Sequence, residues 1–207
     1  MSKRIVIIDY KMGNTLSISN ALEKLGYEAI ISSDHDDINN ADALILPGVG
    51  AFKEAMENIK ANNLLDILND NVINKSKPIF GICLGMQIMA NSGQEMGDTQ
   101  GFGWIDAKVE KIATPNVRVP HVGWNSIEVI KKEPLFTNID SDIHFYFDHS
   151  FHFICDEKYI SSITSYKKPI TASIQKENIF ATQFHPEKSQ IMGLKLMRNF
   201  LNYIEEI

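Results

Sequence analysis

The sequence predicts an α/β fold with an open, mixed and mostly parallel sheet, helices on both faces and an antiparallel hairpin extension. Three observations indicate this class. In the first half, short apolar runs alternate with apolar stripes at helical spacing. After about residue 100 the stretches become longer and extended in character, and an amphipathic helix closes the chain. No Pro/Gly/Ser-rich linker interrupts the 207 residues, so we expect a single domain over residues 1–207.

Short apolar runs in the first half predict strands of a parallel sheet, and the run from Ile5 to Ile8 is consistent with a strand buried on both faces. We expect these strands at residues 5–8, 28–32, 43–46 and 78–82. Between them, apolar residues recur at helical spacing. The segment Gly-Asn-Thr at 13–15 offers an N-cap for the first helix, which Gly26 ends. The next helical stripe covers residues 52–68, and a further helix is expected over residues 84–90.

The second half reads as antiparallel hairpins followed by one helix. Extended stretches with period-2 character cover residues 104–112, 117–130, 144–155 and 161–183, with turns at 167–169 and 176–178. A helical stripe then comprises Leu194, Met197, Leu201 and Ile204. We therefore expect the hairpins to extend the parallel sheet.

Composition narrows the class of function. The formal net charge is -6, which argues against binding to nucleic acids or anionic membranes, and no apolar run approaches the length of a membrane span. The only cysteines are Cys83 and Cys155, too few for a disulfide framework. We expect a cytoplasmic protein.

The segment Gly-Ile-Cys-Leu-Gly-Met-Gln at 81–87 carries the strongest chemical signal. It follows an expected strand and opens an expected helix, with a glycine two residues on either side of Cys83. This is a nucleophile-elbow pattern with cysteine in place of serine. The helix start favours a thiolate, and the N–H of Leu84 points where an oxyanion would form. The alternative is a small buried cysteine packed under a helix.

A thiolate nucleophile needs a base and a group that orients it. Phe-His-Pro-Glu at 184–187 follows an apolar extended run that we expect beside the Cys83 strand. His185 can move the proton, and Glu187 can hold the imidazole because Pro186 restricts the backbone between them. Alone, such a tripeptide is more often a turn.

The loop Pro-Gly-Val-Gly at 47–50 follows the third expected strand. Gly48 and Gly50 allow close approach to a ligand, so the N–H groups of the Gly48, Val49 and Gly50 loop are candidates for an oxyanion hole. The loop should lie at the same carboxyl edge of the sheet as Cys83, where open α/β sheets bind ligands. The alternative is a plain turn between strand and helix.

Together these segments resemble the class I (triad-type) glutamine amidotransferases, whose glutaminase domain has a Cys-His-Glu triad. Within that superfamily, further segments resemble one family, the glutaminase subunits of imidazole glycerol phosphate synthase from histidine biosynthesis. They are Pro-His-Val-Gly-Trp-Asn at 120–125, Tyr-Phe-Asp-His-Ser-Phe at 146–151 and Asp-Tyr-Lys-Met-Gly-Asn at 9–14.

The resemblance implies roles for individual residues. Cys83 would form a glutamyl thioester, with His185 and Glu187 completing the triad. The substrate glutamine would be held by Gln87 and Glu95 and flanked by the backbone of His149, Ser150 and Phe151. Residues near the cyclase-facing surface, where ammonia leaves, would be Asn14, His121, Trp124 and Lys188. Trp124 could instead be a core aromatic residue, and Lys188 a solvated lysine.

The resemblance implies no metal and no organic cofactor. It implies an obligate heterodimer with a cyclase subunit of (β/α)8-barrel type, because ammonia freed into water would be protonated and lost. The chain itself offers no acceptor-substrate domain.

Other functions stay open at this point. Asp148, where the family has an apolar residue, and Gly93-Gln94, where it has Ser-Glu, suggest a paralogous glutaminase that supplies a sugar-modifying synthase in surface polysaccharide biosynthesis. A stand-alone cysteine hydrolase would be active without any partner. The intact Cys83, His185 and Glu187 argue against a degenerate regulatory subunit.

Overall fold

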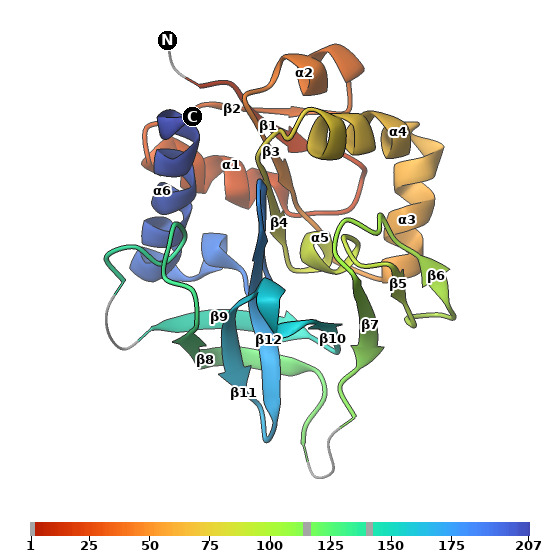
Figure 1. Ribbon diagram of the computed structural model, residues 1–207, viewed down its shortest axis with the longest axis vertical. Helices are drawn as coiled ribbons and strands as arrows, with labels where there is room; N and C mark the ends of the chain where they lie inside the picture. Colours follow the sequence, from red (N-terminus) through yellow and green to blue (C-terminus); the bar gives the residue numbers. More distant parts are fainter. Residues whose placement is uncertain (1–2, 114–116, 140–142) are drawn as a thin grey trace.

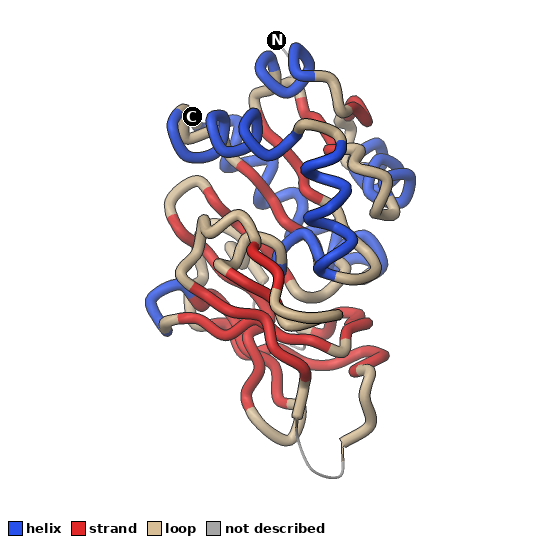
Figure 2. Tube along the Cα trace, turned by 90° about the vertical axis from the view of Figure 1, so that its right-hand side faces the viewer, coloured by secondary structure: helices blue, strands red, loops and turns tan. Residues whose placement is uncertain are grey.

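One long sheet runs through the computed structural model, which describes residues 3–113, 117–139 and 143–207. Within those ranges the sheet has nine strands in the order β2-β1-β3-β4-β13-β12-β11-β8-β9 (Figure 1). The side view separates two parts: helices surround the strands at one end of the molecule, whereas the other end consists almost entirely of strands (Figure 2).

The parallel part of the sheet confirms the strands expected in the first half. Each neighbouring pair is parallel among β2 (Ala29–Ser32), β1 (Ile5–Ile8), β3 (Ala43–Leu46), β4 (Ile79–Ile82) and β13 (Ile179–Thr182). Side chains alternate between two core clusters, so that Val6 and Ile8 face one cluster and Ile5 and Ile7 face the other. Strands β1, β3, β4 and β13 are buried on both faces, as parallel strands covered by helices require, whereas β2 is an edge strand on which Ile30 and Ile31 are exposed.

Helices cover both faces of the parallel strands, as expected (Figure 1). On one side lie α1 (Thr15–Lys24) and α6 (Gln190–Glu206), and on the other α3 (Phe52–Ala61) and α4 (Leu64–Asn69). The Asn14 side chain accepts a hydrogen bond from the Ser17 N–H and caps α1. Helix α2 (His35–Asn40), in which only Ile38 is buried, was not predicted.

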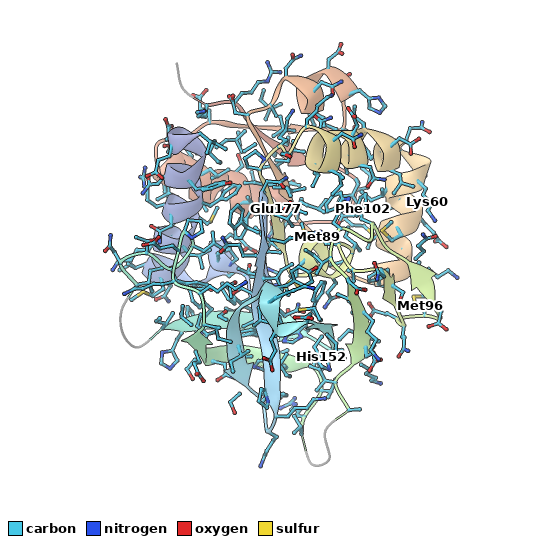
Figure 3. All side chains as sticks on the ribbon, viewed as in Figure 1. Lys60, Met89, Met96, Phe102, His152 and Glu177 are labelled. Atoms are coloured by element: carbon cyan, nitrogen blue, oxygen red, sulfur yellow. The ribbon has the colours of Figure 1, made fainter. Side chains whose placement is uncertain are left out.

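Two expected helices have different bounds in the structure. The stripe at 52–68 is broken by Asn63, whose φ of 55° lies in the left-handed region, and after α4 the chain continues in the short π-helix η1 (Asp70–Asn74). The helix expected over 84–90 ends early, as α5 (Leu84–Gln87). It stops because the carbonyls of residues 88–90 accept N–H groups from residues 102–105 instead of continuing a helical ladder. Met89 and Phe102 from these two segments belong to the same packed region (Figure 3).

The antiparallel extension is present, but it forms two sheets. The long sheet continues through β12 (Pro169–Lys176), β11 (Ile160–Ser165), β8 (His121–Val129) and β9 (His144–His149). A separate sheet in the described residues contains β10 (Phe151–Cys155), β7 (Ala107–Lys111), β5 (Ser92–Gly93) and β6 (Thr99–Gln100). The stretch expected over 144–155 breaks at Ser150, because β9 and β10 pair with strands of different sheets. The short helix η2 (Glu157–Tyr159) leads into β11.

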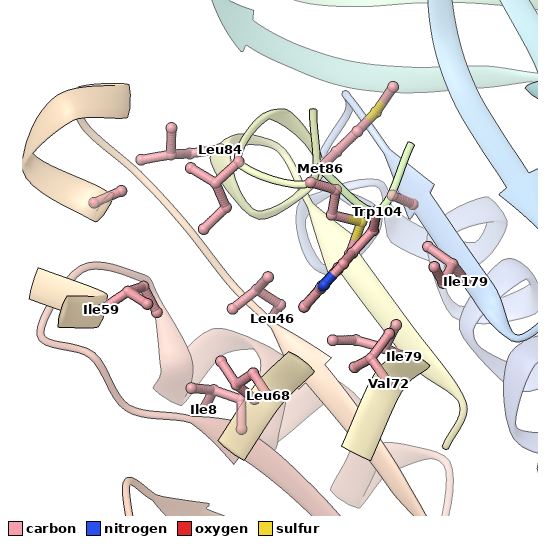
Figure 4. Packing of buried hydrophobic residues seen from close by; sticks show 14 of the residues in the cluster. Ile8, Leu46, Ile59, Leu68, Val72, Ile79, Leu84, Met86, Trp104 and Ile179 are labelled. Atoms are coloured by element: carbon pink, nitrogen blue, oxygen red, sulfur yellow. The ribbon is translucent and has the colours of Figure 1, made fainter. Parts of the chain in front are cut away.

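The apolar core beneath α5 holds the start of this helix at the carboxyl ends of the parallel strands. Leu84 and Met86 of α5 belong to the same apolar cluster as Leu46 of β3, Ile179 of β13 and Trp104 (Figure 4). All of these side chains are nearly inaccessible to solvent. Burial of this kind stabilises by about 25 cal/mol for each Å² of apolar surface removed from water. The start of α5 is therefore held firmly against the sheet.

Candidate active site

A cleft of about 430 Å³ opens at the carboxyl edge of the parallel strands. It lies where the loop after β3, the β4–α5 junction and the β9–β10 junction meet. The lining residues are Val49, Gly50, Ala51, Cys83, Leu84, Gln87, Glu95, Pro120, Asp148, His149, Ser150, Phe151 and His185. Ligands of open α/β sheets bind at this edge.

Cys83 stands at a strained turn between β4 and α5. Its φ of 54° and ψ of -109° are unusual for a residue with a side chain, and backbone strain of this kind is found at functional sites. Its N–H donates to the carbonyl of Thr182 on β13 at 2.8 Å. The turn also needs Gly85, because a Cβ there would lie 1.9 Å from the carbonyl oxygen of Leu46. The elbow predicted around Cys83 is therefore present in the backbone.

His185 and Glu187 are brought together beside Cys83. The two residues flank the start of the short helix η3 (Pro186–Lys188), and His185 Nδ1 lies 2.8 Å from Glu187 Oε1 with both side chains buried. The backbone of His185 is fixed as well, since its N–H donates to the Tyr146 carbonyl and its carbonyl accepts from Ser189 Oγ. Glu187 stands behind the imidazole and does not line the cleft.

The electrostatics of His185 suit proton transfer. Burial lowers the pKa of His185, but its hydrogen bonds and charge interactions with Cys83 and Glu187 outweigh burial and raise the pKa to about 10. At neutral pH the imidazole therefore carries a proton. A cysteine, a protonated histidine and an orienting carboxylate can together perform acyl transfer from an amide.

The loop at 47–50 packs directly against the elbow. Val49 and Gly50 line the cleft, whereas Gly48 lies behind them against α5, where a Cβ would come within 2.7 Å of the Gly85 nitrogen. The Tyr10 hydroxyl donates to the carbonyl of Pro47 at 2.7 Å and anchors this loop from below. Tyr10 was not predicted to contribute, although it belongs to the segment 9–14 that was singled out.

All candidates for binding the substrate glutamine line the cleft: Gln87, Glu95, His149, Ser150 and Phe151. Some of their polar groups already have partners. Glu95 Oε2 accepts from the N–H of Phe52 at the start of α3, a helix whose N-cap Ala51 offers no side-chain acceptor. Gln87 Nε2 donates to the Phe151 carbonyl and to Gln183 Oε1, each at 3.0 Å.

The four candidates for a partner-facing surface have different environments. Trp124 is 49% exposed and meets the ring of Tyr146 edge-on, and Lys188 is exposed with its Nζ over the same ring. Asn14 is exposed at the start of α1. His121, in contrast, is 3% exposed and stacked on Phe147 and Tyr166. The structure therefore places His121 in the interior and not on a surface, because the pleat of β8 turns its side chain inward.

Two further residues at the site were not singled out as functional by sequence reasoning. Gln183 is completely buried, and its Nε2 lies 3.7 Å from the Cys83 sulfur. The Cys83 sulfhydryl also lies 3.9 Å from the backbone carbonyl of Asp148. Gln183 directly follows β13 and precedes His185 by two residues, but no local sequence pattern indicates that its side chain reaches Cys83.

Burial keeps two nearby histidines neutral. Desolvation lowers the pKa of His121 to about 4, and desolvation, followed by smaller effects, lowers the pKa of His149 to about 3. Among the residues that the structure describes, no group of three or more His, Cys, Asp or Glu is placed to hold a metal ion. Within the same residues, none of the helices combines the length and apolar character needed to cross a membrane.

The fold and this site define a class of protein. The family profile described as "Glutamine amidotransferase class-I" matches residues 6–203, and the chain belongs to that family. Solved structures show the same fold. One is described as a glutamine amidotransferase, with a TM-score of 0.77 and 22% identity over 97% of this chain and 98% of that one. Another is PurLQS from Thermotoga maritima, with a TM-score of 0.72 and 19% identity over 98% and 99% of the two chains.

Curated relatives point to one branch of the family. Imidazole glycerol phosphate synthase subunit HisH 2 of Vibrio vulnificus (strain YJ016) is 48% identical over 98% of this chain and 95% of its own length. Subunit HisH 1 of Campylobacter jejuni (strain RM1221) is 46% identical over 95% of this chain and 98% of its own. Subunit HisH of Pelagibacter ubique (strain HTCC1062) is 42% identical over 96% of this chain and 99% of its own length.

Proposed function

We infer that this chain is the glutaminase subunit of an imidazole glycerol phosphate synthase in histidine biosynthesis. It hydrolyses glutamine to glutamate and ammonia and passes the ammonia to a cyclase subunit. The observation that carries this inference is the cleft that brings Cys83, His185 and the buried Glu187 together. It is supported by the 42–48% identity to HisH subunits over nearly the whole chain.

In the mechanism that this geometry supports, the Cys83 thiolate attacks the carboxamide carbon of glutamine and forms a C–S bond. The N–H of Leu84, with N–H groups of the loop from Gly48 through Val49 to Gly50, stabilises the oxyanion. His185 gives its proton to the nitrogen as the C–N bond breaks, and ammonia leaves. His185 then takes a proton from water, which attacks the thioester and releases glutamate. Glu187 holds the imidazole in position throughout.

The amino-acid end of the substrate would lie among the remaining residues of the cleft. The Gln87 amide oxygen and the Glu95 carboxylate are acceptors for the α-ammonium group. The backbone from His149 through Ser150 to Phe151 would flank the carboxylate end. These groups require no metal or organic cofactor for the hydrolysis.

We propose that the chain is one domain that works in a cytoplasmic heterodimer with a (β/α)8-barrel cyclase. Trp124, Lys188 and Asn14 are exposed and suit a partner-facing surface at which ammonia leaves. The net charge of -6 favours neither nucleic acids nor anionic membranes as partners. The reducing conditions of a cytoplasm would keep the catalytic thiol free of disulfides.

The test is glutamate release by the purified chain, measured alone and after addition of the cyclase from the same organism. We expect low activity alone and strong stimulation by the cyclase, with no loss of nitrogen as free ammonia. Strong activity alone that the cyclase leaves unchanged would contradict the partner and favour a stand-alone cysteine hydrolase.

A second candidate function rests on Asp148. Its carboxylate belongs to an exposed residue at the cleft, where it would change the charge that a partner or the leaving ammonia meets. This favours a paralogous glutaminase that supplies a synthase acting on sugars. Restored growth without histidine in a strain lacking its own subunit supports the histidine pathway. Failure to restore growth, with glutaminase activity intact, supports the paralogue.

A further inference from the structure

We propose that Gln183 is a catalytic residue of the glutaminase: its side-chain N–H holds the Cys83 thiolate, Gln87 fixes its orientation, and a hydrogen-bonded chain through His121 and His149 holds the Phe151 carbonyl to which Gln87 donates. The proposal deepens the proposed function and rests on it. It concerns a residue outside the Cys83–His185–Glu187 triad and assigns a new role to His121 and His149.

The position of Gln183 follows from the sheet. β13 pairs in parallel with β4, and Thr182 lies opposite Ile82. The residues that follow, Gln183 and Cys83, are therefore neighbours at the carboxyl edge. The Gln183 backbone N–H donates to the carbonyl of Ala172 on β12, so its backbone is held on the other side as well. Its side chain is completely buried and donates from Nε2 to the Cys83 sulfur at 3.7 Å.

Gln87 determines which end of the Gln183 amide faces the sulfur. Gln87 Nε2 donates to Gln183 Oε1 and to the carbonyl of Phe151. Because a carbonyl can only accept, Gln87 must direct its nitrogen toward Phe151. Gln87 therefore offers N–H groups to Gln183, which must turn its oxygen toward Gln87 and its nitrogen toward Cys83.

The Phe151 carbonyl is held from a second direction by two neutral histidines. His149 Nδ1 lies 2.8 Å from that carbonyl and must donate to it. His149 Nε2 then accepts from His121 Nδ1 at 3.0 Å, and His121 Nε2 accepts from the Asn125 amide at 3.2 Å. The same Asn125 nitrogen donates to the carbonyl of Ser165. Every donor and acceptor in the chain is determined by the backbone carbonyls at its ends.

The orientation of the Gln183 amide has a chemical consequence at Cys83. The sulfhydryl contact with the Asp148 carbonyl exists only while sulfur carries its proton. The Gln183 N–H can donate to sulfur in either state, and its bond strengthens when sulfur is charged. Gln183 therefore favours the nucleophilic form, whereas His121 and His149 act as positioning residues.

The experiment measures the nucleophile without turnover. In a Cys155→Ser background only Cys83 remains to react with iodoacetamide, since the chain has two cysteines. We expect Gln183→Met to slow alkylation at neutral pH about tenfold, the effect of one hydrogen bond to a charged group. With the cyclase present, kcat for glutamine should fall by a similar factor while KM stays nearly unchanged, because the sulfur contact acts on the nucleophile and not on the substrate.

Gln183→Glu provides a second variant in case the methionine variant fails to fold. It keeps the volume and the acceptor but removes the N–H, and it should also slow alkylation. Gln175→Met is the matched control, because Gln175 is a partly buried glutamine on the neighbouring strand β12, outside the cleft. The rate at which Cys83 is alkylated in Gln175→Met should equal that of the parent protein.

His121→Phe tests the part of the hydrogen-bonded chain that lies farthest from Cys83. It keeps a ring between Phe147 and Tyr166 but removes the N–H given to His149. We expect the Cys83 of this variant to be alkylated more slowly than in the parent protein, but by a smaller factor than in Gln183→Met. Wild-type alkylation and kcat in Gln183→Met or Gln183→Glu would overturn the catalytic role of Gln183. Wild-type alkylation in His121→Phe would overturn the positioning role of the histidines.

The alkylation result is independent of the proposed function. Suppose that Cys83 is alkylated rapidly in the wild-type protein and slowly in Gln183→Met, but that neither protein releases glutamate with the cyclase. The proposed function then fails, while the role of Gln183 at the nucleophile stands.

Discussion

At the scale of single residues, the Cys83 sulfur has three neighbours with different chemistry. Gln183 offers a neutral N–H, the Asp148 carbonyl accepts from the thiol, and His185 carries a proton backed by Glu187. Such an arrangement suits a group that must exist as thiol, thiolate and thioester in one cycle. The acidic partner Glu187 is kept out of the cleft, so it affects the reaction only through the imidazole.

The raised pKa of His185 predicts how stability depends on pH. A buried histidine with a pKa of about 10 contributes stability that is complete below its ordinary pKa of about 6.5 and is lost as the pH rises toward 10. The difference in free energy of unfolding between the wild type and His185→Gln should therefore shrink over this window. Urea unfolding of both proteins across it measures the difference. A difference that does not change with pH would contradict the charged state of His185.

Single residues were predictable to different degrees. Cys83, His185 and Glu187 could be found because their chemistry is written in short local patterns. Gln183 and Tyr10 could not, because their roles depend on which strand lies beside which. The family resemblance implied that His121 lies near the partner-facing surface, as Trp124 does, but three residues along a strand turn a side chain to the opposite face.

At the scale of elements, the site depends on how closely α5 approaches the sheet. Gly85 lies against the backbone of β3, and Gly48 lies against the backbone of α5. Neither position has room for a side chain. The elbow and the loop at 47–50 are therefore packed as one unit, which keeps the candidate oxyanion donors at a fixed distance from Cys83.

This packing predicts the effect of Gly85→Ala. A Cβ there would lie 1.9 Å from the Leu46 carbonyl oxygen, so α5 or β3 must move. We expect the free energy of unfolding to fall by about 3 kcal/mol or more, as in overpacked cores. Urea unfolding gives the value.

Gly97→Ala is the control. Gly97 has a φ of 101° but nothing within 4 Å of a Cβ, so only backbone strain of about 1 kcal/mol is expected. Equal losses in the two variants would contradict a steric need for glycine at residue 85, because Gly85 lies in helix α5 and has no positive φ.

The sequence predicted the parallel strands and the closing helix because their apolar patterns are regular. It did not predict α2, whose six residues bury only Ile38. It also did not predict the second sheet, since β5 and β6 are two-residue strands. The break at Ser150 cannot be read from alternation, because β9 and β10 each keep an extended pattern while pairing with different neighbours.

At the scale of the whole molecule, the cleft lies close to the aromatic pair formed by Trp124 and Tyr146. Trp124 and Tyr146 lie opposite each other on β8 and β9, and Lys188 follows the catalytic candidates in η3. A partner bound over these residues would lie next to His185, which in the proposed mechanism protonates the leaving ammonia. This arrangement supports a direct route for ammonia between the two subunits.

Trp124→Ala should therefore weaken the complex with the cyclase. Trp124 is half exposed, and large aromatic residues often dominate the energetics of interfaces, so we expect Kd to rise about tenfold or more. Tm should change little, because the side chain lies at the surface. Titration calorimetry and thermal unfolding measure the two quantities.

Ile31→Ala is the control for this variant. Ile31 is also a partly exposed apolar residue, but it lies on β2, the opposite edge of the long sheet from β9. It should leave Kd unchanged. An equal effect of the two variants on Kd would contradict a docking surface around Trp124.

The central claim is that the Cys83 sulfur performs the hydrolysis of glutamine. The most direct measurement is glutamate release in the presence of the cyclase by the wild type, by Cys83→Ala and by Cys155→Ser. We predict a loss of at least about 10³-fold in Cys83→Ala, as for removal of other nucleophiles, and wild-type activity in Cys155→Ser. Full glutaminase activity in Cys83→Ala would contradict the account.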